Sequence, residues 1–414
     1  IIFIYTIYYY WSFLFFLLIS SKIIGLVSTL SIGDTPVGFA SIKKPGKTIE
    51  VSTKSDLVNY AKKGGYIVYV KSMIDMSEGM MPSEAGGSTS GLDALVKSES
   101  GYSNYKSLVD AYAKACSTST NDKSSSSSSE IGNKIWACNK AYGNKVKLQI
   151  VSDTWIIGTT ANSGIRGGQI SINGVSNVVL RNLILRDAYD PFPHHEKNDG
   201  YNAQYDGVVI QGSSKNIWVD HCTFEDTLHL INVKTGGSTS EKWQTYDGLL
   251  DMKNDISGIT ISWNKFQNHD KTMLIGSSDS DGNNSSRTIT LHHNYFFNCG
   301  QRLPMARNSQ IHIFNNVYEA SNAYYSNSYC VGVRKNALII AENNNFGSGI
   351  GYSFKDSDGT VYASGNSDTS SKKMNSKTTN SKPFKVPYNY NLDSADNAKN
   401  SVKGDAGAGK SFSK

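Results

Sequence analysis

Between residues 175 and 346, one pattern of apolar and polar positions recurs along the chain. Each copy is a run of β-favouring residues that leads to Asn or Cys, then one residue, then a large apolar residue. The paired positions are Asn182 with Ile184, Cys222 with Phe224, Asn264 with Phe266, Asn294 with Phe296, Asn316 with Tyr318 and Asn344 with Phe346. Successive Asn or Cys positions lie 40, 42, 30, 22 and 28 residues apart.

The shortest of these intervals fits one coil of a parallel β-helix, and the longer intervals fit coils that carry insertions. One coil cannot bury its apolar face alone, but stacking makes the core continuous. Stacked Asn side chains can hydrogen-bond along the axis as a ladder, and we call the repeated Asn or Cys positions the ladder positions. The aromatic residues two positions later can stack inside. The alternative is an antiparallel β-sandwich, but that fold gives no reason for the same sequence pattern to recur. We therefore expect an all-β fold, a parallel β-helix.

Helices are expected only at the flanks of this repeat. One is predicted over residues 55–63 (SDLVNYAKK), after Thr53, and another over residues 394–403 near the end of the chain. Length alone would suggest two or three domains for a chain of 414 residues. The repeat favours one long repetitive domain instead.

Composition narrows the class of protein further. Charged residues make up 18% of the chain and hydrophobic residues 38%, which excludes a charge-rich disordered chain. The 37 Gly, 24 Tyr and only 8 Pro argue against collagen and against a helical bundle. The net charge of +6 permits an acidic partner. Nucleic acid is not expected as that partner, because there is no Lys/Arg run or known motif.

Residues 1–20 are an almost unbroken apolar and aromatic run, with no charge before Lys22. We interpret residues 1–27 as a signal peptide, and a retained membrane anchor is the alternative. Since the remaining chain has no comparable run, we expect a secreted, extracellular protein without stable membrane association once the signal is removed. The β-helix domain is then expected over residues 40–414.

A low-complexity insertion is expected over about residues 116–138, where Cys116 and Cys138 bracket a Ser tract at 124–129. A disulfide between these cysteines would suit an oxidising compartment, but the sequence leaves the pairing open. The remaining three cysteines lack metal-ligand spacing and are expected to be buried small residues.

Three aspartates fall at similar distances before the ladder positions. Asp206 lies 16 residues before Cys222, Asp247 lies 17 before Asn264, and Asp251 lies 13 before Asn264. Asp206 and Asp247 are thus expected on neighbouring coils, with Asp251 nearby on the same face. Carboxylates that converge repel each other unless a cation neutralises them, and oxygen donors favour Ca²⁺ over Zn²⁺. Three solvated surface aspartates are the alternative.

Cations follow the ladder positions. Lys271 lies 7 residues after Asn264, Arg302 lies 8 after Asn294, and Arg307 follows in RLPMAR. Neighbouring coils would bring Lys271 and Arg302 together. A cluster of Ca²⁺, Lys and Arg suits a polyanionic sugar, whose carboxylates bind to the metal and the cations. The alternative is that these cations pair with local carboxylates for structural reasons.

Several segments together resemble the polysaccharide lyase family 1 pectate lyases, specifically those of the Bacillus type. They are QYDGVVI, NIWVDHCTF, NHDKTMLIGSSDSD, RTITLHHNYF and QRLPMAR, and they stand in the family's order and near its spacing. The resemblance extends over roughly residues 40–414, with the Ser-tract region as a variable insertion. It implies a right-handed single-stranded parallel β-helix with short flanking helices.

The resemblance also implies residue roles. Arg302 matches the general base, and Lys271 and Arg307 match residues that grip substrate carboxylates. Asp220 and His221, in WVDH, look like part of a packed, hydrogen-bonded interior beside the site, with a catalytic His221 as the alternative. The aspartates that match the primary calcium site are Asp206, Asp247 and Asp251.

The implied activity is that of a monomeric, calcium-dependent pectate lyase. Polygalacturonate, linked α-1,4, would be cleaved by β-elimination to 4,5-unsaturated oligogalacturonates. An arginine base requires a neutral guanidine, which predicts an alkaline optimum. One alternative is a pectin lyase acting on methyl-esterified pectin, although retention of all three aspartates favours de-esterified substrate. Others are a non-catalytic polysaccharide-binding β-helix and, less fittingly, a glycosidase with paired carboxylates.

Overall fold

The computed structural model describes residues 29–31, 35–80, 90–118, 129–196, 200–228, 243–321, 325–356, 358–372 and 374–413. The predicted signal peptide and residues 124–128 of the Ser tract lie outside these ranges. The chain divides into two compact units, Ile1–Asp34 with Lys410–Lys414, and Thr35–Gly409. In the first unit, β1 (Thr29–Ser31) pairs in parallel with β31 (Ser411–Ser413). Within the described ranges, no helix has the length and apolar character needed to cross a membrane.

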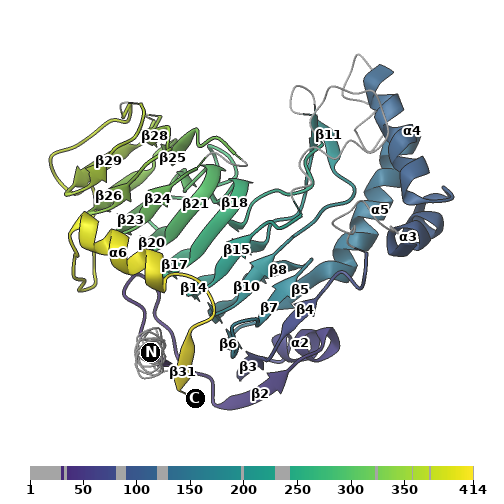
Figure 1. Ribbon diagram of the computed structural model, residues 1–414, viewed down its shortest axis with the longest axis horizontal. Helices are drawn as coiled ribbons and strands as arrows, with labels where there is room; N and C mark the ends of the chain where they lie inside the picture. Colours follow the sequence, from purple (N-terminus) through teal and green to yellow (C-terminus); the bar gives the residue numbers. More distant parts are fainter. Residues whose placement is uncertain are drawn as a thin grey trace, which may run out of the picture. The chain divides into compact units, whose positions relative to one another are not determined.

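The second unit is built on three parallel sheets, each of which takes one strand from each of many stacked coils (Figure 1). Sheet I contains β2 (Lys47–Val51), β3 (Tyr66–Val70), β6 (Thr154–Gly158), β9 (Ser176–Arg181), β14 (Lys215–Asp220), β17 (Ser257–Ser262), β20 (Thr288–His292), β23 (Gln310–Phe314), β26 (Leu338–Glu342) and β29 (Thr360–Ser364). Sheet II contains β4 (Met73–Asp75), β7 (Gly164–Arg166), β10 (Ile184–Arg186), β15 (Thr223–Glu225), β18 (Lys265–Lys271), β21 (Tyr295–Gln301), β24 (Val317–Glu319), β27 (Asn345–Phe346) and β30 (Ser367–Asp368). Sheet III contains β5 (Lys147–Ile150), β8 (Gln169–Asn173), β13 (Val208–Gln211), β16 (Leu250–Met252), β19 (Leu274–Ile275), β22 (Met305–Ala306), β25 (Tyr329–Val333) and β28 (Tyr352–Lys355).

Each complete coil runs from sheet III through sheet I to sheet II, and then enters sheet III of the next coil. Neighbouring strands in the three sheets are parallel, as in β14 with β17 and β18 with β21. The predicted right-handed parallel β-helix is therefore confirmed, and the sandwich alternative is wrong. An antiparallel hairpin, β11 (His194–Glu196) with β12 (Gly200–Asn202), projects from one coil.

The predicted ladder exists, and it forms an axial chain of hydrogen bonds. The amide oxygen of Asn294 accepts from both the backbone and the side-chain N–H of Asn264, each at 3.0 Å. The same contacts continue through Asn316 and Asn344 to Asn366, one coil beyond the predicted copies. Beside them, buried aromatic rings stack at centroid separations of 4.7–4.9 Å, from Phe224 to Phe346.

The first predicted copy is wrong by one residue. Ile184 pairs with Thr223, and Leu185 pairs with Phe224, so Leu185 holds the aromatic position. Asn182 has a φ of 56° and lies at the corner before the ladder position. His221, Trp263 and His293 have the same left-handed conformation before their ladder residues, with φ between 48° and 54°. Asn tolerates this conformation unusually well, which explains the shifted register in the prediction.

Both predicted flanking helices are present. Helix α2 (Lys54–Ala61) begins after Thr53, whose side chain accepts from the backbone N–H of Asp56, and α6 (Ala395–Asp405) begins after Ser394. Val402 of α6 packs against Val317 and Tyr295 on the outside of sheet II.

The expectation of helices only at those two places is wrong. Helices α3 (Ser90–Ser100), α4 (Tyr105–Thr118) and α5 (Glu130–Val146) form a bundle with its own buried core. Cys116 and Cys138 belong to that core as buried helical residues, and neither is in a disulfide. The 116–138 region is thus helical at both ends, because apolar residues there pack against aromatic residues of the coil insertions.

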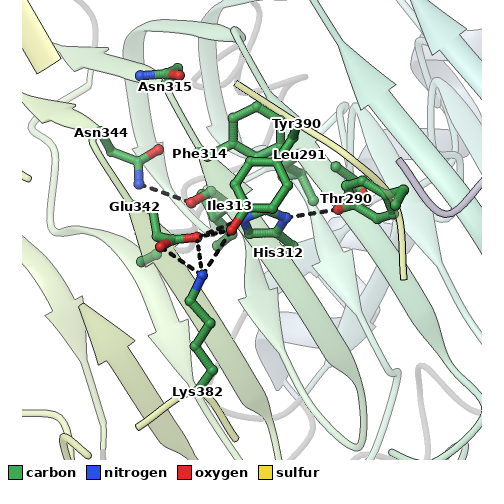
Figure 2. Close-up of polar contacts among 12 residues, drawn as sticks. Thr290, Leu291, His312, Ile313, Phe314, Asn315, Glu342, Asn344, Lys382 and Tyr390 are labelled. Atoms are coloured by element: carbon green, nitrogen blue, oxygen red, sulfur yellow. Dashed lines mark hydrogen bonds and ion pairs between the residues drawn. The ribbon is translucent and has the colours of Figure 1, made fainter. Parts of the chain in front are cut away.

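A segment of the C-terminal region is fixed to the outer face of sheet I by a polar cluster (Figure 2). Glu342 accepts hydrogen bonds from Lys382 and Tyr390, at 3.0 and 2.6 Å. Nε2 of the buried His312 lies 3.2 Å from the same carboxylate, and its Nδ1 lies 2.8 Å from the hydroxyl of Tyr388. Burial raises the pKa of Glu342, but the hydrogen bonds from His312, Tyr390 and Lys382 outweigh it and lower the pKa to about 2.

We predict that Glu342→Gln destabilises the protein by about 1–3 kcal/mol, because a neutral amide cannot satisfy three donors. The carboxylate's pKa is lower in the folded state, so its contribution is present above the ordinary value of 4.5 and is lost as pH falls toward 2. Urea unfolding of wild type and variant at several pH values in this window measures both effects. Glu78→Gln is the control, since Glu78 forms an exposed ion pair with Lys54. Equal losses in the two variants would contradict the prediction.

Candidate active site

Five of the six predicted site residues lie at or near the corner where sheet II leads into sheet III, and Arg307 lies at the far end of the short sheet III strand. Lys271 ends β18 and pairs with Gln301 at the end of β21, so Arg302 follows on the next coil. Arg307 comes directly after β22. Asp251 lies in β16 and pairs with Val209 of β13, while Asp206 lies just before β13. The predicted neighbouring-coil placement of these charges is confirmed.

Two of the three aspartates share one cation. The ammonium of Lys253 lies 2.9 Å from Oδ2 of Asp206 and 3.5 Å from Oδ2 of Asp251. The other oxygens accept backbone N–H groups, Asp206 from Gly248 at 3.1 Å and Asp251 from Leu274 at 2.9 Å. Both carboxylates are buried, at 3% and 2% exposure. They are held by the backbone as well as by the lysine.

The electrostatics of this pair favour a cation. Burial raises the pKa of Asp206 and of Asp251, and the negative charge of Asp206 raises the pKa of Asp251 further. Burial lowers the pKa of Lys253, but Asp206 and Asp251 outweigh burial, so its pKa is raised. One ammonium cannot balance both carboxylates when both are ionised, so additional positive charge would be favoured beside them.

Asp247 is paired with a different lysine. Its Oδ1 lies 2.9 Å from the ammonium of Lys271, which also donates to Oδ1 of Asn202 at 2.7 Å. The Lys271 side chain is 9% exposed and that of Asp247 is 26% exposed. Asn202 ends the hairpin strand β12, so the hairpin helps to fix the position of Lys271.

Arg302 has a φ of 62°, a region that residues other than Gly, Asn and Asp seldom adopt. Its backbone carbonyl accepts from the N–H of Met273 at 2.8 Å. Burial raises the pKa of the neighbouring Tyr329 to about 12, and the positive charge of Arg302 opposes that rise. Nε of Arg302 is buried without a hydrogen-bond partner, and no residue in the described ranges forms an ion pair with this guanidinium.

Arg307 is held by two contacts to the preceding coil. Its Nε donates to Oδ1 of Asp279 at 3.0 Å, and one terminal nitrogen donates to the carbonyl of Gly276 at 3.0 Å. Asp279 is 64% exposed, so solvent weakens this ion pair. Arg307 therefore keeps a fixed position with a partner that an anionic ligand can replace.

Asp220 and His221 lie at the corner between sheets I and II, so the expectation that they lie beside the site is wrong. The expected packing and hydrogen bonding are present. Oδ2 of Asp220 lies 2.7 Å from Nε of Arg181 and 2.8 Å from Nδ1 of His221. Burial raises the pKa of Asp220, but His221 and Arg181 lower it more, so the net shift is downward. This position gives no support to a catalytic His221.

A metal ion could be held by Asp206, Asp251 and Asp247, although the residues that the structure describes contain no ready-made group of three metal-binding side chains. Two observations fit a cation there. Lys253 already places a positive charge between two carboxylates. A Cβ at Gly248 would overlap Oδ1 of Asp251 and lie 3.0 Å from Oδ1 of Asp206, so glycine keeps the space between them open. Oxygen donors of this kind suit Ca²⁺.

The sequence reasoning missed Lys253 and Asn202. Lys253 lies two positions after Asp251, and alternation along an extended strand puts such residues on one face. That signal was available. Asn202 had no comparable signal, because its contact with Lys271 depends on the hairpin's path.

The stacked coils and their corner of carboxylates and cations define a β-helical protein with an ion-rich surface site. A family model described as pectate lyase matches residues 68–411. The chain belongs to this pectate lyase family.

Individual relatives agree with that assignment. The chain is 39% identical to Pectate lyase D of Dickeya chrysanthemi over 204 residues, which is 48% of this chain and 52% of the relative. It is 35% identical to a Pectate lyase of Bacillus subtilis (strain 168) over 293 residues, 67% of this chain and 64% of the relative. The chain thus matches about half the length of the Dickeya relative.

Solved structures extend the comparison over most of the chain. A pectate lyase bound to a hexasaccharide is 29% identical with a TM-score of 0.75, and the alignment covers 93% of this chain and 99% of that one. A pectate lyase from Acidovorax avenae subsp citrulli has the same TM-score at 21% identity, covering 94% and 98%, which supports the fold alone.

We predict that Lys253→Met destabilises the metal-free protein by about 3 kcal/mol, because it leaves two buried carboxylates without their shared cation. Urea unfolding in the presence of a chelator measures the loss. Lys106→Met is the matched control, since Lys106 pairs with Asp110 at the surface, where its side chain is 71% exposed, and should cost less than about 1 kcal/mol. A loss for Lys253→Met no larger than the control's would show that Lys253 is not the required counter-ion.

Proposed function

We propose that this protein is a secreted pectate lyase that cleaves polygalacturonate by calcium-assisted β-elimination and releases 4,5-unsaturated oligogalacturonates. The observation that carries the proposal is the grouping of carboxylates and cations around one corner of the coils. Asp206 and Asp251 flank Lys253, while Lys271 and Arg307 supply further positive charge. Family membership and the resemblance to a hexasaccharide-bound pectate lyase support the same substrate class.

The chemistry requires removal of a weakly acidic proton. The C5 proton of galacturonate is α to the C6 carboxylate, so its loss places negative charge on that group. Calcium held by Asp206, Asp247 and Asp251 would withdraw charge from the carboxylate when bound. Lys271 and Arg307 add fixed positive charge at the substrate carboxylates, where preorganised cations stabilise developing negative charge.

Arg302 is the base in this proposal. A carboxylate partner would stabilise the protonated guanidinium and oppose its use as a base. No described residue provides such a partner, and Nε is already stripped of hydrogen bonds. Arg302 takes the C5 proton, the electrons of the broken C5–H bond form the new C4–C5 double bond, and the C4 oxygen leaves with the electrons of the C4–O bond. Since the guanidine must be neutral, the optimum should be alkaline.

The main alternative is a lyase for methyl-esterified pectin. An ester carries no charge, so a cation-rich site adds little to its binding free energy. A free uronate forms a charge-assisted hydrogen bond with each cation that it contacts. A non-catalytic binding protein would need the cations but not an arginine without an ion-pair partner. The site therefore favours elimination on de-esterified polymer.

We expect Arg302→Lys to lower the rate of elimination by at least about 100-fold, the usual contribution of a general base. Lysine keeps the positive charge, so folding and calcium binding should persist. Formation of unsaturated product from polygalacturonate at alkaline pH, followed by absorbance, measures the rate. Arg166→Lys is the control, since Arg166 ends β7, three coils before β18 in sheet II, and pairs with Asp187 at 3.3 Å. Full activity of Arg302→Lys would reject the base assignment.

We expect Asp247→Asn to raise the calcium concentration needed for half-maximal activity, because one anionic donor is lost and Lys271 loses its ion-pair partner. Activity is measured during a calcium titration after treatment with EDTA. Asp358→Asn, an exposed aspartate outside the site, is the control. Unchanged calcium titration and EDTA sensitivity in Asp247→Asn would refute its role as a ligand.

A further inference from the structure

We propose that the sugar-binding surface extends from Lys271 across the β11–β12 hairpin to Trp136 on helix α5, where it binds a further uronic acid residue of the polymer. The inference rests on polygalacturonate as the substrate and adds a binding site remote from the reacting bond. It depends on three observations: an exposed tryptophan, a continuous line of contacts to Lys271, and polar partners beside the tryptophan.

Trp136 is 47% exposed, more than any other large hydrophobic side chain in the described ranges. Tryptophan side chains are highly buried on average, so a half-exposed indole that is also held in place by a neighbouring ring is a candidate contact for a ligand. The ring is not loose, since it packs on the imidazole of His194 with centroids 4.8 Å apart. A flat, supported aromatic face is suited to the C–H face of a pyranose ring.

We call Trp136 and the supporting ring of His194 the platform. The hairpin connects this platform to Lys271, the lysine predicted to bind substrate. His194 of β11 and Asn202 of β12 are directly paired across the hairpin, so their side chains project from the same face. Asn202 accepts the hydrogen bond from the ammonium of Lys271 at 2.7 Å. Trp136, His194, Asn202 and Lys271 therefore follow one another in a continuous line of neighbours.

Helix α5 supplies polar groups beside Trp136. Asn133 and Lys140 are exposed, and with Trp136 they are spaced three and four residues apart, which places them on one side of the helix. Lys140 can bind a uronate carboxylate, and Asn133 can hydrogen-bond sugar hydroxyls. An aromatic face, a cation and an amide together match the chemistry of a charged pyranose better than that of a neutral one.

The platform is firmly attached to the coil that carries Asp206. Asn139, in the same helix, donates to both oxygens of the buried Asp190 at 3.1 Å. Asp190 also accepts from the backbone N–H of Gln204, two residues before Asp206, at 2.8 Å. A binding surface held in this way requires little reorganisation when the polymer binds.

The test uses binding, so that it does not depend on turnover. In an Arg302→Lys background, we expect Trp136→Ala to weaken retardation in gels containing polygalacturonate, with about a fivefold higher Kd, the loss typical of one aromatic stack. Trp136→Phe keeps a flat ring and should recover most of the affinity. Leu392→Ala is the matched control, because Leu392 is 40% exposed elsewhere on the chain. Thermal unfolding should be unchanged in Trp136→Ala.

The outcomes separate this inference from the proposed activity. If wild type forms unsaturated product but Trp136→Ala binds polymer as tightly as its parent, the remote site is wrong and the activity stands. If wild type forms no product but Trp136→Ala still weakens binding and Trp136→Phe restores it, the remote site stands and the activity is wrong. Equal weakening by Leu392→Ala would also overturn the site, since the effect would then be general loss of apolar surface.

Discussion

The constraint on which the structure depends is the axial register of the coils, held by the buried Asn ladder. Each amide in the ladder satisfies a backbone N–H and a side-chain N–H of the preceding coil, as Asn294 does for Asn264. Because a buried amide without its partners is costly, one coil cannot slip against the next. The aromatic rings stacked beside the ladder add burial in the same register. Residues far apart in sequence thereby occupy fixed neighbouring positions, which is what a site assembled from several coils requires.

This same register explains how far the sequence could predict the fold. The repeated sequence pattern of Asn, one residue and then an aromatic residue was sufficient to identify the coils, since a buried ladder restricts the residue type at one position in every coil. It failed by one residue at Asn182, because Asn is favoured for two different reasons at these corners. One is the ladder itself, and the other is the left-handed turn before it. In pairs such as Asn315 and Asn316, both demands are met by consecutive Asn residues, whereas near Asn182 only the turn position is Asn.

The candidate site was predictable to the extent that it depends on register alone. The places of Asp206, Asp251, Lys271 and Arg302 follow from counting residues to the ladder, and the structure puts them on neighbouring coils. Their partners did not follow, because long side chains choose partners in three dimensions. The helical bundle was missed for a related reason. Its apolar residues, such as Leu108 and Tyr112, bury against side chains of a coil insertion and not against the repeat.

The pairing of charges also bears on the proposed binding of a polyanionic substrate. Asp206 and Asp251 have Lys253, Asp247 has Lys271, and Arg307 has the exposed Asp279. These internal pairs satisfy buried charges that would otherwise be costly in the absence of ligand. In the proposed function, Asp206, Asp247 and Asp251 would hold calcium, and Lys253 and Lys271 would then be available to bind uronate carboxylates. The hydrogen bond from Lys271 to Asn202 involves none of the three aspartates, so it would still hold the lysine in place when Asp247 binds a metal ion. The hairpin thus contributes a neutral side-chain partner for Lys271, whose other partner, Asp247, is charged.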